Sequence, residues 1–184
     1  KEYNERLIHT MTTANKLTIL RVLMIPVFLV VLYWGFPGSR YVALGIYIVA
    51  CLTDLLDGYI ARHYDQISDF GKFMDPLADK CLVMAALCWF VEEGTFFAWV
   101  LAIVLLREFA VSGMRLVAVE KGRVIAAGWS GKIKTASTMV CICLILFGIP
   151  QWLNYVCQGV ILVTTVYSGI EYFAKNADVF KVIK

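Results

Sequence analysis

The chain has 184 residues, of which 60% are hydrophobic and 17% charged, and its formal net charge is +3. Soluble domains usually contain about 45–50% apolar residues, and the mean hydropathy here is +0.74, so the composition excludes an ordinary soluble globular protein. The length predicts one domain. We expect residues 11–184 to form a single membrane domain, and residues 1–10 to be a cloning remnant or a disordered tail. The polar start, KEYNERLIHTMTTANK, argues against an N-terminal signal peptide.

Six apolar segments follow one another along the chain. A helix needs about 20 residues to cross the hydrocarbon of a membrane, and each segment reaches or approaches that length. They are Leu17–Trp34, Tyr41–Arg62, Phe73–Val91, Phe96–Val119, Ile133–Ile149 and Trp152–Phe173. Loop-forming sequences such as GFPGSR, EEGT and GIPQ separate them. The pattern predicts an all-α fold, an integral membrane bundle of six transmembrane helices.

The distribution of positive charge predicts the orientation of this bundle. With six helices, both termini and the connections at residues 62–72 and 120–132 lie on one side. Of the 17 Lys and Arg residues, only Arg40 then falls on the opposite side. Positive charge accumulates on the cytoplasmic side of membrane proteins. We therefore expect the protein in the cell membrane, with both termini and the polar motifs on the cytoplasmic side.

The cysteines do not suggest a disulfide framework or a zinc site. All six fall within apolar segments and no two form a CxxC pair, so we expect small buried hydrophobic residues. They are Cys51, Cys81, Cys88, Cys141, Cys143 and Cys157.

Four aspartates stand at the ends of the second and third apolar segments. The pattern is Asp54-x-x-Asp57-Gly58-x-x-Ala61-Arg62, eight residues, and then Gly71-x-x-x-Asp75-x-x-x-Asp79. Each residue of a helix turns by about 100°, so each set occupies one helix face. The short polar connection HYDQISDF makes the two helices antiparallel neighbours, and we expect the two faces to meet.

Carboxylates that face one another repel unless something neutralises them. Hard divalent cations prefer oxygen ligands, and two such ions would balance four aspartates and could clamp the oxygens of a phosphoryl displacement. Gly58, Ala61 and Gly71 would let another molecule approach the backbone, and Arg62 offers a planar fork for phosphate. The alternative is that small residues only permit close helix packing and the acids only solvate helix ends.

The aspartate pattern resembles the signature of the CDP-alcohol phosphotransferases, and every specified position matches. The resemblance implies that residues 11–184 are one domain of this family, a homodimer of six-helix subunits with two divalent cations, Mg²⁺ or possibly Mn²⁺. It also implies that Asp54, Asp57, Asp75 and Asp79 ligate metal, with Asp79 acting as the catalytic general base, and that Gly58, Ala61, Arg62 and Gly71 line the CDP-lipid site.

Other segments resemble the phosphatidylglycerophosphate synthase branch of that family. ANKLTILRVLMIPVF matches its start, with Asn15 and Thr18 assigned to the CDP-lipid site, although Ala14 stands where many members have proline. LREFAVSGMRLVAVEKG, AAGWSGKIKTASTM and SGIEYF match further along. The resemblance implies that CDP-diacylglycerol and glycerol 3-phosphate are the substrates and that membrane lipids, not nucleic acid, surround the protein.

A cluster of positive charge independently favours an anionic acceptor. Arg107, Arg115, Lys132 and Lys134 lie at the expected cytoplasmic ends of the fourth and fifth helices. On one regular helix the two lysines would point about 200° apart, so either the helix starts near them or only one faces the pocket. We expect Glu108 to orient Arg115. Alternatively, these cations only extend to the membrane interface.

The expected reaction transfers the phosphatidyl group of CDP-diacylglycerol to glycerol 3-phosphate and releases CMP, with Asp79 taking the proton of the attacking hydroxyl. Alternatives are another acceptor such as inositol phosphate or serine, an intramembrane prenyltransferase, and an ion transporter based on intramembrane carboxylates. Pro76, between Asp75 and Asp79, either falls in the first turn of its helix or bends that helix.

Overall fold

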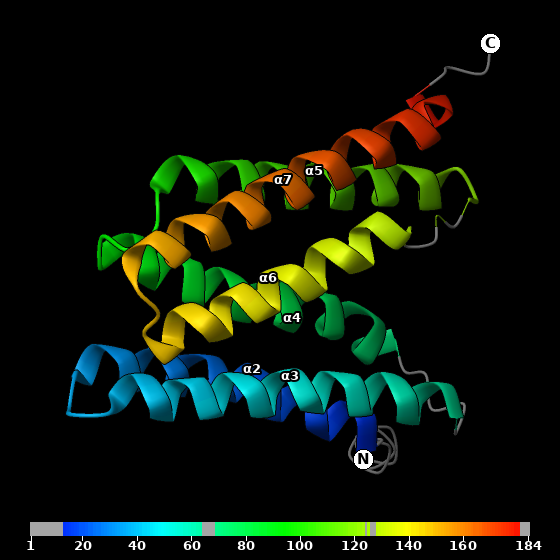
Figure 1. Cartoon of the computed structure of the whole chain (residues 1–184). Helices are drawn as coiled ribbons and strands as arrows, with labels where there is room; N and C mark the ends of the chain where they lie inside the picture. Colours follow the sequence, from blue (N-terminus) through cyan, green and yellow to red (C-terminus); the bar gives the residue numbers. More distant parts are fainter. Residues whose placement is uncertain (1–12, 64–68, 124, 126–127, 181–184) are drawn as a thin grey trace, which may run out of the picture. The chain divides into compact units, whose positions relative to one another are not determined.

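A computed structural model describes residues 13–63, 69–123, 125 and 128–180. Within these ranges, the side chains of residues 13–17, 54–63, 69–73, 75, 76, 79, 179 and 180 are not described. All elements of the described part are helices (Figure 1). They are α2 (Thr13–Trp34), α3 (Ser39–His63), α4 (Asp69–Glu92), α5 (Ala98–Glu120), α6 (Trp129–Phe147), α7 (Gln151–Asn176) and the 3₁₀ helix η1 (Ala177–Phe180).

The all-α prediction is confirmed, and each of the six expected segments corresponds to one α-helix. The largest differences are at the starts of α2, α4 and α6, which begin one turn earlier than their apolar segments, at Thr13, Asp69 and Trp129. Polar residues continue these helices because the first turn of a helix can extend past an apolar region into water. The segments Leu17–Trp34, Phe73–Val91 and Ile133–Ile149 therefore belong to helices longer than their apolar parts.

Two helices, α6 and α7, are long and apolar enough to cross a membrane. The described parts of α2 and α3 contribute shorter apolar stretches, Thr18–Trp34 and Ser39–Thr53. Helix α5 is continuous, but the charged residues Arg107, Glu108 and Arg115 interrupt its apolar sequence. The fold is thus helical with at least two membrane-compatible helices.

The chain divides into two compact units, residues 1–86 and 87–184. In the first unit α2 packs against α3. The rings of Phe28 and Tyr47 meet at this contact, 6.1 Å between centroids, beside the buried Ala43 and Ala50. Small residues at these positions let the two helix backbones approach closely.

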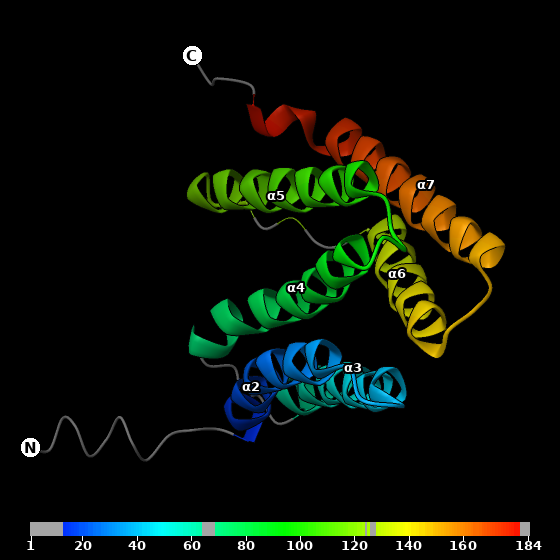
Figure 2. The same cartoon turned by 90° about the vertical axis from the view of Figure 1, so that its left-hand side faces the viewer.

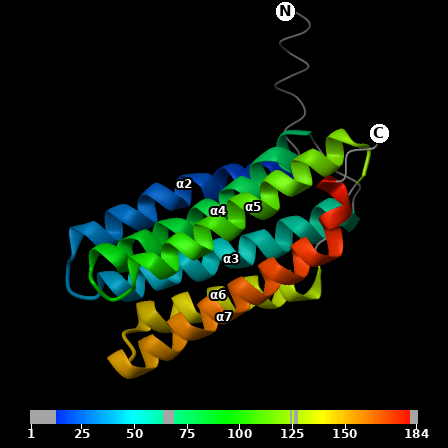
Figure 3. The same ribbon diagram turned by 90° about the horizontal axis from the view of Figure 1, so that it is seen from above.

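In the second unit α7 packs against both α5 and α6 (Figure 2). Helices α6 and α7 form a hairpin and run side by side (Figure 3). Gly148 ends α6 in the left-handed conformation, with φ 88°, and its N–H donates to the carbonyl of Ile145. Glycine adopts this conformation without steric cost, and Pro150 then provides the extended residue that precedes α7.

Two buried amides of α7 hold the start of α5. Asn154 and Gln158 both donate to the carbonyl of Thr95, at 2.7 and 3.0 Å. The Gln158 Oε1 accepts the N–H of Phe97, the residue that caps α5, at 3.0 Å. These bonds satisfy backbone groups at a helix start and fix the position of α5 along α7.

The structure also bears on the predictions for Pro76 and for the cysteines. Pro76 lies inside α4, which begins at Asp69, so the first-turn alternative is wrong. Because proline has no N–H, it cannot donate to the carbonyl of Lys72. The prediction of buried cysteines is confirmed for Cys141 and Cys157 and is wrong for Cys81 and Cys88, which are exposed; Cys51 and Cys143 are partly buried.

Candidate functional site

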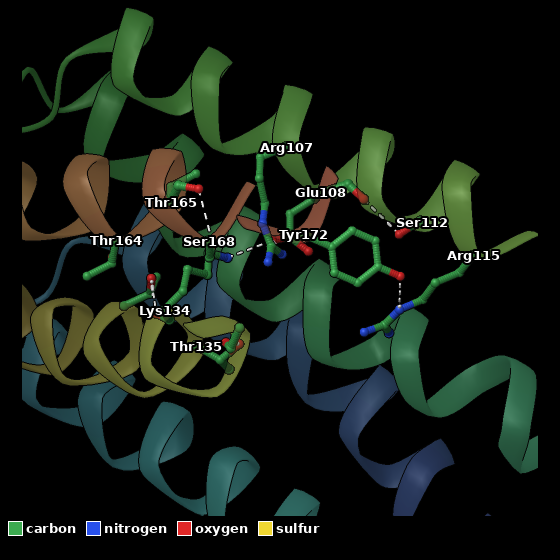
Figure 4. A network of polar contacts seen from close by, with 12 residues as sticks. Arg107, Glu108, Ser112, Arg115, Lys134, Thr135, Thr164, Thr165, Ser168 and Tyr172 are labelled. Carbon is green, nitrogen blue, oxygen red and sulfur yellow. Dashed lines mark hydrogen bonds and ion pairs between the residues drawn. The ribbon is translucent and has the colours of Figure 1, made fainter. Parts of the chain in front are cut away.

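Three charged side chains meet in the second unit, where α5, α6 and α7 come together. The Arg107 Nη1 lies 2.9 Å from Glu108 Oε1, and the Lys134 Nζ lies 2.7 Å from the same oxygen. Figure 4 shows Arg107, Glu108 and Lys134 pointing toward one another. The three side chains are only 13%, 12% and 6% exposed. Buried charges are tolerated when they are paired in this way.

The side chain of Arg107 reaches this cluster by passing α7. A Cβ atom built on Gly169 would lie 3.3 Å from Arg107 Cγ, and one built on Gly131 of α6 would lie 3.7 Å from Arg107 Nη2. Gly169 therefore leaves the space through which the arginine runs from α5 toward α6. The Arg107 Nε is buried and has no hydrogen-bond partner in the described part of the chain. A buried donor without a partner is costly, which marks a place where a ligand could bind.

Arg115 contacts α7 two turns further along α5. Its Nε donates to the hydroxyl of Tyr172 at 3.2 Å, and its guanidinium lies 5.6 Å from the centre of that ring. The sequence predicts that Glu108 orients Arg115. The ion pairs described for Glu108 join it to Arg107 and Lys134, and the partner described for Arg115 is Tyr172.

The two lysines of α6 have different surroundings. Lys134 is buried in the charge cluster, whereas Lys132 is exposed and its Nζ lies 5.0 Å from the centre of the Trp129 ring. Helix α6 already begins at Trp129, so both lysines belong to one regular helix and point in different directions. The structure thus favours the alternative in which only Lys134 faces the cluster.

A polar cavity of about 270 Å³ lies beside Tyr172. It is lined by Arg123, Ile125, Gly128, Ser130, Glu171, Tyr172, Lys175 and Asn176. Its cations are paired, Lys175 with Glu171, and Arg123 with Asp178 of η1. Because Tyr172 both lines the cavity and contacts Arg115, the cavity lies next to the contact between these two residues.

The four aspartates lie on α3 and α4, and their side chains are outside the described residues. Asp54 and Asp57 fall in α3, and Asp75 and Asp79 fall in α4, so the three- and four-residue spacings are both helical spacings as predicted. Four carboxylates form a donor set suited to hard divalent cations. The expected metal ligation stays a prediction.

The residues assigned to the CDP-lipid site lie mostly in the same undescribed group of side chains. They are Asn15, Gly58, Ala61, Arg62 and Gly71. Thr18 is described: it is 1% exposed on α2, and Arg21, one turn later, is also 1% exposed. A buried arginine requires polar partners, so this face of α2 is polar inside the first unit.

Sequence reasoning missed two residues of the site. Gly169 and Tyr172 lie three residues apart on α7 and therefore share a face. The segment SGIEYF contains both, but in the sequence it indicates only a resemblance to the family. A glycine and a tyrosine one turn apart carry no charge pattern, so their contacts with Arg107 and Arg115 could not be read from the sequence.

Comparison with known proteins defines the class of the protein. The family model of CDP-alcohol phosphatidyltransferases matches residues 11–170, and the chain belongs to this family. Membership counts against the prenyltransferase and ion-transporter alternatives and makes the chain a phospholipid-synthesising transferase associated with membranes.

Individual relatives narrow the comparison. A CDP-diacylglycerol–glycerol-3-phosphate 3-phosphatidyltransferase of Bacillus subtilis is 37% identical over 91% of this chain and 96% of its own length. A protein of Mycobacterium tuberculosis named "Probable phosphatidylglycerophosphate synthase" is 39% identical over 88% of this chain and 80% of its own. A Shigella flexneri enzyme with the same name as the Bacillus protein is 37% identical over 88% of this chain and 93% of its own length.

Proposed function

We propose that this protein transfers the phosphatidyl group from CDP-diacylglycerol to glycerol 3-phosphate, giving phosphatidylglycerol phosphate and CMP. The names of its relatives support this reaction, since these proteins are 37–39% identical to this chain over 88–91% of its length. The choice of glycerol 3-phosphate as acceptor rests on the mostly covered charge cluster of Arg107, Glu108 and Lys134.

The cluster suits a phosphate monoester. Arg107 and Lys134 supply two positive charges, of which Glu108 neutralises one. Arg115, two turns further along α5, supplies another. A phosphate monoester carries about −1.5 to −2 charges at pH 7, and charge-assisted hydrogen bonds to phosphate are the strong ones. A serine acceptor has no phosphate to occupy such a site. Lys132, on another face of α6, attracts the anion from the surface.

The membrane location is supported by the distribution of residues on α5. The side chains of Arg107 and Glu108 are mostly covered, 13% and 12% exposed, while their neighbours Leu106 and Phe109 are 70% and 73% exposed. Charges inside and apolar residues outside are typical of a helix surrounded by lipid. We propose that all six helices span the cell membrane, with both termini and the active site on the cytoplasmic side and a homodimer as the working assembly.

The four aspartates complete the proposed mechanism. Asp54, Asp57, Asp75 and Asp79 would hold two divalent cations, Mg²⁺ or Mn²⁺. Such ions, when bound, neutralise a diphosphate and stabilise a departing phosphate. Asp79 accepts the proton of the primary hydroxyl of glycerol 3-phosphate, and the oxygen attacks the phosphorus that carries the lipid while CMP leaves. Asn15, Thr18, Gly58, Ala61, Arg62 and Gly71 bind the CDP-lipid.

One assay tests the reaction. Purified protein in detergent receives CDP-diacylglycerol, Mg²⁺ and one acceptor, and CMP release is measured with glycerol 3-phosphate, inositol phosphate or serine. We expect release only with glycerol 3-phosphate. Release with inositol phosphate instead would assign another acceptor within the family.

The base assignment has its own test. Asp79→Asn removes the proton acceptor but keeps the size of the side chain, so CMP release should fall to the background level while the protein keeps its helical content. Substantial activity of this variant would contradict the role of Asp79.

A further inference from the structure

The two most buried cations of the cluster share one carboxylate oxygen. We infer that Glu108 is a positioning residue, which holds Arg107 and Lys134 together so that both can bind the phosphate of the acceptor. This inference rests on the proposed function and adds to it a residue that does not itself touch the substrate.

The geometry supports this role because the cations come from different helices. Arg107 belongs to α5 and Lys134 to α6, and each of these helices packs against α7. Glu108 Oε1 lies 2.9 Å from the arginine nitrogen and 2.7 Å from the lysine nitrogen. The distance between Arg107 Nη1 and Lys134 Nζ therefore cannot exceed the sum of these two distances. A phosphate has several oxygens that can accept from both cations at once.

Both cations keep donors for such a ligand. Lys134 has three N–H groups, and in the described part of the chain its side chain binds Glu108. The Arg107 Nε is buried and has no partner there. A bound phosphate would satisfy these donors without displacing the carboxylate that holds the two side chains.

The charge of Glu108 matters as well as its shape. Without it, two buried like charges would face each other at short range, where the protein interior screens them weakly. The flexible lysine would then move away from the arginine, and the pair could no longer bind one phosphate. With Glu108 present, the three side chains keep a net charge of +1, which attracts the negative charge of a phosphate monoester.

The test is the variant Glu108→Gln, which keeps the size of the side chain and removes its charge. The matched control is Glu120→Gln, at the exposed end of the same helix. The measurements are the KM for glycerol 3-phosphate, the KM for CDP-diacylglycerol, and kcat from CMP release. We expect the KM for glycerol 3-phosphate to rise at least about 10-fold in Glu108→Gln, with the KM for CDP-diacylglycerol within about twofold of the unmodified protein. Glu120→Gln should change neither constant.

Equal increases of both KM values would show general damage and overturn the inference, as would an unchanged KM for glycerol 3-phosphate. If Glu108→Gln does not fold, Glu108→Asp replaces it: the shorter carboxylate keeps the charge but cannot reach both cations, so an intermediate rise is expected and an unchanged KM overturns the inference. An unmodified protein that releases no CMP with glycerol 3-phosphate would instead contradict the proposed function, which separates the two failures.

Discussion

Lys134 of α6 donates to Glu108 of α5 at 2.7 Å; the lysine is buried and the glutamate side chain is only 12% exposed. The two helices are therefore joined by a charged contact as well as through their common packing against α7. In a protein surrounded by lipid, such a buried charge cluster is costly and indicates function.

The two lysines of α6 provide the most direct test of this cluster. Lys134→Met should raise the KM for glycerol 3-phosphate by about 10- to 100-fold, because a charged hydrogen bond contributes about 1.5–3 kcal/mol. Lys132→Met, which removes an exposed lysine over Trp129, should raise it less than about threefold. Steady-state kinetics of CMP release measures both. Equal effects of the two substitutions would contradict the assignment of Lys134 to the site.

Gly169 should control the position of Arg107. In Gly169→Ala the new Cβ would lie 3.3 Å from Arg107 Cγ, so the arginine must shift by a few tenths of an ångström. We expect a rise of about 3- to 10-fold in the KM for glycerol 3-phosphate, which corresponds to about 1 kcal/mol. Gly159→Ala is the control on the same helix, since nothing lies within 4 Å of its Cβ. If both variants keep the original KM, the space at Gly169 is not needed.

The hydroxyl of Tyr172 should orient Arg115. Tyr172→Phe keeps the ring under the guanidinium and removes the acceptor of the 3.2 Å hydrogen bond. The KM for glycerol 3-phosphate should rise by about 3- to 10-fold, because one hydrogen bond to an exposed charged group is lost. Tyr167→Phe, at an exposed position of α7, should leave the KM unchanged. A larger effect at Tyr167 would assign the acceptor contact elsewhere.

Gln158 should contribute to stability and not to the reaction. Its side chain accepts the N–H of Phe97 and donates to the carbonyl of Thr95, and it is buried. Gln158→Ala would leave the N–H of Phe97 without its partner and the carbonyl of Thr95 with Asn154 as its described side-chain donor, at a cost of about 1–3 kcal/mol in the free energy of unfolding. We expect a lower Tm in detergent, with both KM values unchanged. Gln151→Ala, at an exposed position, should keep the original Tm. An equal decrease of Tm in Gln151→Ala would contradict the stabilising role of the Gln158 hydrogen bonds.

Removal of divalent cations tests the aspartate site. A chelator should abolish CMP release, and added Mg²⁺ or Mn²⁺ should restore it, because four carboxylates would otherwise repel one another and the diphosphate. The Tm of the same samples should rise on addition of the metal, since a ligand that binds only the folded state stabilises it. Activity that persists in excess chelator would exclude the proposed ions.

The amino-acid sequence by itself determined the helices. Apolar runs and loop residues are local signals, so all six segments matched helices, and the errors were confined to ends such as Thr13 and Trp129, where polar residues continue a helix by one turn. The aspartate motif and its spacing were also local. Its side chains lie outside the described residues, and its role stays a prediction.

Only the tertiary structure decided which charges meet. The sequence left open whether Lys132 or Lys134 faces the pocket and paired Glu108 with Arg115, because helical periodicity orders residues on one helix but does not say which face meets its neighbours. The packing of α5 and α6 against α7 buried Lys134 with Glu108 and Arg107, and brought Tyr172 to Arg115. These contacts join residues far apart in the chain, and their formation depends on how side chains fill the space between helices.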